Sequence, residues 1–216
     1  MTSKHHPSDQ TLLRFAAGTL PAGPALVVAA HLSGCPFCQR RMAIFEAIGG
    51  EMLVRTDPQA LSPEALEQTL ARLDLDHRAG RTAPQPSPVS IDGIVLPGPL
   101  AGCKVGPWRA VGPGVRLSRV GVPHAPEANV ILLKVKANKR MPAHGHTDLE
   151  VTQVLKGSFS DGDSRYEVGD FVEGDDETDH SPVIGSDGEC ISLAAIEGHV
   201  RFKGFLGRLL APIVGI

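Results

Sequence analysis

Residues 31–38 read HLSGCPFC and bring one imidazole, His31, and two thiols, Cys35 and Cys38, into close succession. Steps of four and three residues return side chains to nearly the same face of a helix. The three groups can therefore converge on one point, either along one helix or across a sharp corner between two helices. Two thiolates and an imidazole suit Zn²⁺, which takes four nitrogen or sulfur ligands in a tetrahedron. The stretch thus predicts a zinc site that needs one more ligand.

The fourth ligand has to come from elsewhere in the chain, and His5 and His6 near the N-terminus are the candidates. A Cys-x-x-Cys pair is also typical of thioredoxin-like redox proteins, in which it follows a strand of a βαβ unit. The residues around Cys35 and Cys38 have helical rather than βαβ patterning. We therefore predict a structural zinc site and not a redox pair.

The composition excludes several function classes. The chain has 216 residues, enough for two domains, and a net charge of −3 without the basic stripe that direct nucleic-acid binding requires. Its four cysteines are too few for a secreted disulfide scaffold. Neither a signal peptide nor a run of about 18 apolar residues is apparent. These features predict a soluble cytoplasmic protein without a membrane anchor, and they leave its oligomeric state open.

The first third of the sequence predicts four helices. They are expected from Ser8 or Asp9 to Gly18, from Ala25 to Leu32, from Pro36 to Val54, and from Ser62 to about His77. The fourth has a Ser cap followed by Pro, a typical helix start. Loose segments flank it on both sides, so it is expected to act as a clamp arm. Residues 1–78 are interpreted as a zinc-stapled helical domain and 79–90 as a Pro-rich linker.

From about residue 91 the pattern changes to short apolar runs separated by Gly, Pro and Asp, which is typical of a β-sandwich or small barrel. The expected strands cover residues 108–111, 115–120, 129–135, 151–155, 166–168, 190–194 and 199–202. The chain is therefore expected to be an α + β protein in two domains, with residues 91–216 forming the all-β one.

The β half carries a second set of metal ligands, namely His144, His146, Glu150 and His180. His144 and His146 point to one face of a strand, because side chains alternate with a period of two. Glu150 shares that face if the strand continues, and His180 is expected from a neighbouring strand. Three imidazoles and a carboxylate suit Zn, Fe, Mn, Ni or Cu, and the ligand types do not choose among these metals.

The second ligand set resembles the cupin motifs. His144-x-His146-x₃-Glu150-x₆-Gly157 is similar to the first motif, and the spacing from Gly169 to His180 is that of the second. The resemblance implies a jelly-roll barrel that binds a metal. Asp175 and Glu177 stand where cupins usually have Pro and Gly, and Ile184 where they often have Asn. These departures argue against the usual cupin enzyme chemistry.

The first ligand set resembles the zinc-binding anti-sigma domains, whose mark is His-x₃-Cys-x₂-Cys with an upstream histidine. That resemblance implies His6 as the fourth zinc ligand. A zinc anti-sigma domain followed by a cupin is similar to the ChrR family of anti-sigma factors. The resemblance implies that the helical domain inhibits an extracytoplasmic-function (ECF) sigma factor. It also implies that the cupin senses oxidative stress such as singlet oxygen and releases the sigma factor.

The sigma-binding residues are expected on the apolar faces of the third and fourth helices. They are Phe45, Ile48, Met52, Leu66, Leu70 and Leu73. Cys190 is a candidate sensor thiol, although a buried inert thiol is its ordinary interpretation. The alternative function is a cupin metalloenzyme, either a dioxygenase or an isomerase, with an accessory zinc domain. We expect a regulator and no catalytic residues.

Overall fold

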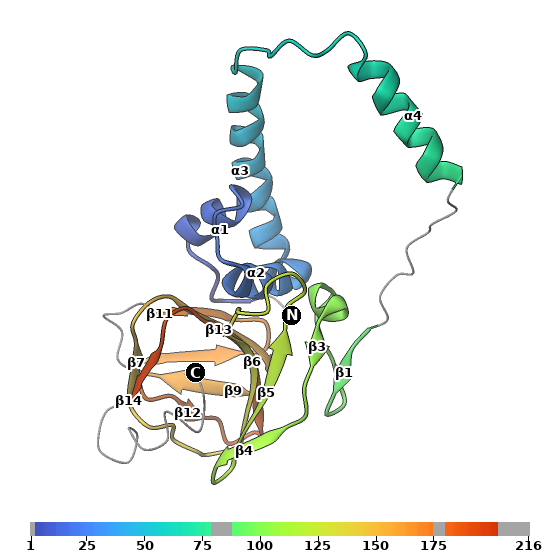
Figure 1. Cartoon of the computed structure of the whole chain (residues 1–216). Helices are drawn as coiled ribbons and strands as arrows, with labels where there is room; N and C mark the ends of the chain where they lie inside the picture. Colours follow the sequence, from blue (N-terminus) through green and yellow to red (C-terminus); the bar gives the residue numbers. More distant parts are fainter. Residues whose placement is uncertain (1–2, 79–87, 175–179, 203–216) are drawn as a thin grey trace.

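The structure is a computed structural model that describes residues 3–78, 88–174 and 180–202. Most of the predicted linker, the motif positions Asp175 and Glu177, and the C-terminal residues from 203 onward lie outside the described residues. The N-terminal part is helical and the rest is built of strands (Figure 1). The predicted class, four helices followed by a β-rich half, is confirmed. Within the described residues, no helix is long and apolar enough to cross a bilayer.

Local sequence signals account for the ends of the helices. The helices are α1 (Asp9–Ala16), α2 (Ala22–Gly34), α3 (Pro36–Val54) and α4 (Ala65–Arg78). The Ser8 hydroxyl caps α1 by accepting a hydrogen bond from the Thr11 N–H at 3.2 Å. Cys35 alone separates α2 from α3, in an extended conformation, and Pro36 occupies the first position of α3. The ligand stretch is therefore a corner between two helices.

Helices α1, α2 and α3 contact one another, whereas α4 stands away from them and from the strands (Figure 1). The three leucines of α4 lie open, with exposed fractions of 71% for Leu66, 52% for Leu70 and 55% for Leu73. An isolated helix of this length gains little stability from its own hydrogen bonds. Its apolar side chains are thus available to a partner, as expected of a clamp arm.

The strands form one large sheet, one small sheet and two pairs. They are β1 (Ser90–Ile91), β2 (Ile94–Val95), β3 (Lys104–Val105), β4 (Arg109–Gly112), β5 (Val115–Gly121), β6 (Val130–Val135), β7 (His144–His146), β8 (Glu150–Lys156), β9 (Ser158–Asp161), β10 (Ser164–Glu167), β11 (Phe171–Gly174), β12 (Val183–Ile184), β13 (Cys190–Ile196) and β14 (Val200–Phe202). The large sheet has the order β11-β8-β13-β6-β5-β3, with β4 also on β5, and all its pairs are antiparallel. The small sheet has the order β10-β9-β12, and β14 pairs with β7.

The central strands of the large sheet are buried on both faces, which explains their continuous apolar sequences. Every residue of β13 is buried. Leu193 and Ala195 belong to the core that also contains the helices, whereas Ala194 and Ile196 point into the barrel cavity. The alternation follows the period-two geometry of a strand.

Helix α2 packs directly on the outer face of this sheet, against β13 and β8. Its Val27 and Val28 are fully buried in one core with Val130 and Leu193 of the cupin. Gly23 lies at this contact, where a Cβ would be in van der Waals contact with the Ala195 Cβ, at 3.4 Å. The two predicted domains therefore share a continuous apolar core and are not merely joined by a linker.

The glycine of the first cupin motif is required by both space and backbone angle. Gly157 has φ +72°, and a Cβ would lie 2.5 Å from the Glu189 carbonyl oxygen. We expect Gly157→Ala to lower the free energy of unfolding by about 2–5 kcal/mol, since the left-handed angle costs about 1–2 kcal/mol and overpacking about 1–3 kcal/mol. Chemical denaturation followed by fluorescence of the single tryptophan, Trp108, measures the loss.

A matched control for this substitution is Gly162→Ala, because Gly162 has φ +55° but nothing within 4 Å of its Cβ position. Gly162→Ala should lower the free energy of unfolding only by the backbone cost, about 1–2 kcal/mol. Equal losses for Gly157→Ala and Gly162→Ala would contradict the steric argument.

Candidate metal centres

The first candidate centre joins the N-terminal segment to the corner between α2 and α3. The ligand atoms of His6, His31, Cys35 and Cys38 all lie within 4.8 Å of one another. The His6 Nδ1 is 3.4 Å from both the Cys35 Sγ and the Cys38 Sγ, and the His31 Nε2 is 3.3 Å from the Cys38 Sγ. These four residues are the ones expected from the sequence.

The distances fit a tetrahedral zinc site. With Zn–S bonds of about 2.3 Å and Zn–N bonds of about 2.0–2.1 Å, a sulfur and a nitrogen ligand lie about 3.5 Å apart. His6 is the fourth member, and its ring stacks on Phe37 with centroids 4.6 Å apart. His5 instead contacts the Tyr166 ring, with centroids 4.5 Å apart. Of the two candidate histidines, His6 and not His5 belongs to the cluster with the thiols.

Burial determines the protonation of the first centre before a metal binds. It lowers the pKa of His31 to about 4, so the imidazole is neutral and can act as a ligand at neutral pH. It raises the pKa of Cys38 to about 12, with a further contribution from the hydrogen bond to Cys35. A thiol of this kind keeps its proton until a metal displaces it. A redox pair would instead need a lowered thiol pKa.

The second candidate centre lies in the barrel. His144 and His146 are on β7, Glu150 begins β8, and His180 pairs with His144 through reciprocal backbone hydrogen bonds of 2.9 and 3.0 Å. The expected neighbouring strand for His180 is therefore present as a single bridge. The strand breaks between His146 and Glu150, so the carboxylate reaches the cluster from the next strand and not by continued alternation.

The ligand atoms of this second cluster also lie within 4.8 Å of one another. The Glu150 Oε2 is 2.6 Å from the His146 Nε2 and 3.6 Å from the His180 Nε2, and the two Nε2 atoms are 3.1 Å apart. With metal–ligand bonds of about 2.1 Å, neighbouring ligands are about 3.0 Å apart in an octahedron and about 3.4 Å apart in a tetrahedron. The spread covers both geometries, so the cluster suits a divalent metal without selecting one.

Outer hydrogen bonds orient two of these imidazoles. The His180 Nδ1 is 3.1 Å from the Asp161 Oδ2, and the His144 Nδ1 is 2.9 Å from the Pro142 carbonyl oxygen. An Nδ1–H donated outward leaves the Nε2 lone pair directed at the metal position. Asp161 was not predicted, since nothing in the sequence connects it to a histidine that follows it by nineteen residues.

The Glu150 carboxylate stays ionised in this setting. Burial alone would raise its pKa, but the hydrogen bond with His146 and the adjacent imidazoles outweigh that effect and lower the pKa below its usual value. Burial and the neighbouring His180 likewise lower the pKa of His144. An ionised carboxylate and neutral imidazoles are the forms that bind metals.

A cavity of about 330 Å³ opens beside the second cluster, inside the barrel. Its wall is mostly apolar and includes Leu117, Ile131 and Phe159, with His146 and Glu150 on the polar side. Cys190 also lines it, but the thiol is buried, and this burial together with the charge of Asp187 raises its pKa to about 12. At neutral pH Cys190 is therefore a thiol and not the reactive thiolate.

The expected sigma-binding residues fall into two groups. Ile48, Met52, Leu66, Leu70 and Leu73 are exposed on α3 and α4. Phe45, in contrast, is half-buried and packs against the core of the helical part. Ile44 lies four residues before Ile48 and is exposed. It takes the place on the open apolar face of α3 that was expected for Phe45.

Comparison with known proteins identifies both halves. A family model described as the ChrR cupin-like domain matches residues 100–200. The anti-sigma-E factor ChrR of Cereibacter sphaeroides is 38% identical over 221 residues, covering all of both chains. A chain of the crystal structure of Rhodobacter sphaeroides SigE in complex with the anti-sigma factor ChrR matches with a TM-score of 0.73 and 33% identity, over 91% of this chain and all of that one. The chain belongs to the ChrR family of anti-sigma factors.

Proposed function

We propose that this protein binds and inhibits an ECF sigma factor in the cytoplasm, and that its cupin half controls the release. The observation that carries the proposal is the full-length relationship to the anti-sigma-E factor ChrR. The match to a ChrR structure determined with SigE supports the same partner class. Both findings favour a regulator over the alternative of a cupin dioxygenase or isomerase.

The first cluster would hold zinc as a structural ion. Two buried thiols and two imidazoles at tetrahedral separations suit Zn²⁺ better than oxygen-preferring metals. Binding would tie His6 to the corner of α2 and α3 and would stabilise the helical part. The adjoining surface offers α3 and α4 to the sigma factor, with the exposed leucines of α4 as its apolar contacts.

The second cluster would hold a divalent metal in the sensing half. Zn, Fe, Mn and Ni all accept three imidazoles and a carboxylate. The mostly apolar cavity beside the cluster gives a small molecule access to that metal. The signal we propose is oxidative, with singlet oxygen as the first compound to test. Metal analysis of the purified protein identifies the ion.

Co-expression with the ECF sigma factor encoded nearest to its gene tests this function. A tagged sigma factor should retain the protein through purification, and the complex should be inactive in sigma-dependent transcription. The purified complex should contain zinc. Failure of the metal-loaded protein to bind or inhibit that sigma factor would refute the proposal.

Removal of a cupin ligand should separate sensing from inhibition. With the first centre saturated with zinc, we expect His146→Ala to bind the sigma factor as well as the original protein does, because His146 lies in the barrel and not on α3 or α4. Release of the sigma factor by photosensitised singlet oxygen should fall at least tenfold. Transcription from a sigma-dependent promoter, measured before and after illumination, gives both quantities.

His199→Ala is the matched control for His146→Ala. His199 is an exposed histidine near β14 that is not part of the His144–His180 cluster. It should leave both inhibition and release unchanged. A normal response from His146→Ala would show that the cupin metal takes no part in sensing.

A further inference from the structure

The N-terminal arm, residues Ser3–Ser8, lies along one end of the cupin and makes regular contacts with it. The Phe171 N–H donates to the His5 carbonyl oxygen at 3.1 Å, which adds the arm to the start of β11. The Ser3 hydroxyl donates to the Gly169 carbonyl oxygen at 3.0 Å, and the Ser8 N–H donates to the Glu173 Oε1 at 3.0 Å. The arm that carries His6 is therefore fastened to the cupin along its length.

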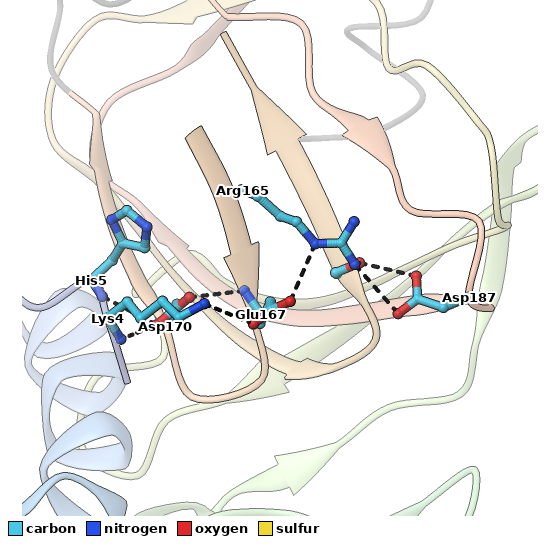
Figure 2. Close-up of polar contacts among 7 residues, drawn as sticks. Lys4, His5, Arg165, Glu167, Asp170 and Asp187 are labelled. Carbon is cyan, nitrogen blue, oxygen red and sulfur yellow. Dashed lines mark hydrogen bonds and ion pairs between the residues drawn. The ribbon is translucent and has the colours of Figure 1, made fainter. Parts of the chain in front are cut away.

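Asp170 is the centre of this contact (Figure 2). Its Oδ1 accepts hydrogen bonds from the N–H groups of Lys4, at 2.6 Å, and His5, at 3.1 Å, and its Oδ2 accepts from the Glu167 N–H at 2.9 Å. The residue is 2% exposed. A buried carboxylate that accepts three N–H groups holds its donors firmly, since these are charge-assisted bonds and leaving any partner unpaired is costly.

The same turn of the cupin also contacts the zinc-ligand set directly. The His31 Nδ1 donates to the Gly169 carbonyl oxygen at 3.0 Å. This hydrogen bond selects the tautomer in which the His31 Nε2 has a free lone pair, and that atom faces the Cys38 Sγ at 3.3 Å. The turn from Glu167 to Phe171 therefore orients His31 through a carbonyl group and His6 through the arm.

A short strand connects this turn to the second cluster. β11 begins at Phe171 and ends at Gly174, which is the register partner of Glu150 on β8. Glu150 is one of the four ligand residues of the barrel centre. The four-residue strand β11 therefore begins at the turn that contacts His31 and ends beside Glu150, a ligand residue of the barrel centre.

We propose that Asp170 is a positioning residue for the first metal centre, and that the turn Glu167–Phe171 transmits the state of the cupin metal to it. Asp170 contacts no ligand atom and acts by holding the arm that presents His6. The inference rests on the proposed zinc at the first cluster. It adds that the cupin determines how tightly this zinc is held, which gives the sensing half a direct route to the sigma-binding half.

Titration of the metal-free full-length protein with Co²⁺ tests the proposal. Co²⁺ bound by thiolates absorbs in the near ultraviolet and reports only the Cys35–Cys38 centre, whereas the barrel centre has no thiolate ligand. We expect Asp170→Ala to weaken Co²⁺ binding at the thiolate centre by about 10-fold, the lower end of the loss caused by removing an outer hydrogen bond to a metal ligand, because Asp170 acts one step further out, through the arm. Asp170→Asn, which keeps one acceptor oxygen for the arm, should lose less.

Two variants of the arm distinguish positioning from damage to the cupin. Lys4→Pro removes the arm's N–H donor to the Asp170 Oδ1 and leaves the cupin sequence unchanged, because proline has no N–H. It should weaken the thiolate centre as well. Lys4→Ala keeps the N–H and loses only an exposed 3.4 Å ion pair with Glu167, so it should bind like the original protein.

The outcomes separate the possible failures. Absence of any thiolate–Co²⁺ band in the unmodified protein would refute the proposed zinc site itself. Unchanged Co²⁺ affinity of the thiolate centre in Asp170→Ala would overturn the positioning role. So would a weaker affinity in Asp170→Ala together with an unchanged affinity in Lys4→Pro.

Transmission through the turn is tested by combining substitutions. His146→Ala should shift Co²⁺ affinity at the thiolate centre in the original background and not in Asp170→Ala. Equal shifts in both backgrounds would overturn transmission through the turn.

Discussion

Cys38→Ser is expected to abolish zinc binding at the first centre and, with it, binding of the sigma factor. The Cys38 sulfur is buried and lies within 3.4 Å of both the His6 Nδ1 and the His31 Nε2, so no other side chain in the cluster has more ligand neighbours. A serine hydroxyl does not ionise in this setting and is a poor zinc ligand. The released His6 would leave the arm and the helix corner without a common anchor.

The loss should be large because structural zinc contributes much of the folding free energy of small zinc domains, about 10–16 kcal/mol in isolated zinc-finger peptides. Here α2 also packs on the cupin, so we expect the chain to stay folded while the angle between α2 and α3 changes. Metal analysis, the thiolate–Co²⁺ band and retention on a tagged sigma factor measure the three consequences.

Cys103→Ser is the control for this substitution. Cys103 is also buried, and burial raises its thiol pKa, but it belongs to neither ligand cluster. It should retain both zinc and the sigma factor. If Cys38→Ser lost zinc yet bound the sigma factor with unchanged affinity, the metal would have no role in holding the sigma-binding surface.

Leu70→Asp on α4 is expected to weaken sigma binding by at least about 30-fold, the effect of about 2 kcal/mol typical of an interface hot spot. Leu66, Leu70 and Leu73 form one apolar stripe at helical spacing, and all three are exposed. No partner covers them within the described chain, so a charge there should leave the free protein intact. Binding is measured by titrating the metal-loaded protein into labelled sigma factor.

Gln68→Asp places the same charge on the same helix, on the face away from the stripe. Both substitutions carry a similar, small helix-propensity cost, so the difference between them reports contact with the sigma factor. Phe45→Ala gives the opposite pattern, because Phe45 packs against the core and its loss should mainly reduce stability. Equal affinities for Leu70→Asp and Gln68→Asp would remove α4 from the binding surface.

The parts of the fold that the sequence predicted best depend on neighbours in the chain. The Ser8 cap, Pro36 at the start of α3 and the apolar run of β6 involve residues a few positions apart. The same holds for three ligands of each set, where spacings of two to four residues set which side chains can meet. The fourth members, His6 and His180, lie 25 and 30 residues from the nearest other ligand, so spacing alone did not place them.

The sequence was less informative wherever one segment had to meet another far along the chain. Without the family resemblance it left the choice between His5 and His6 open. It also placed Phe45 among the sigma-binding residues and gave no sign that α2 would pack on β13. It also missed Asp161 and Asp170, whose partners are nineteen and about 165 residues away. Short polar residues in turns carry no local pattern that identifies such partners.

The sequence alone determined the two halves of this protein, the closely spaced members of the two ligand sets and the family, because helix caps, strand patterning and ligand spacing are all local properties. Only the tertiary structure decided which histidine faces the thiols, which apolar residues remain open, and how the halves join. These depend on packing and on hydrogen bonds between distant segments. The contact of Asp170 and Gly169 with the zinc-ligand segments is of this kind, since it exists only after the arm, α2 and β11 have come together.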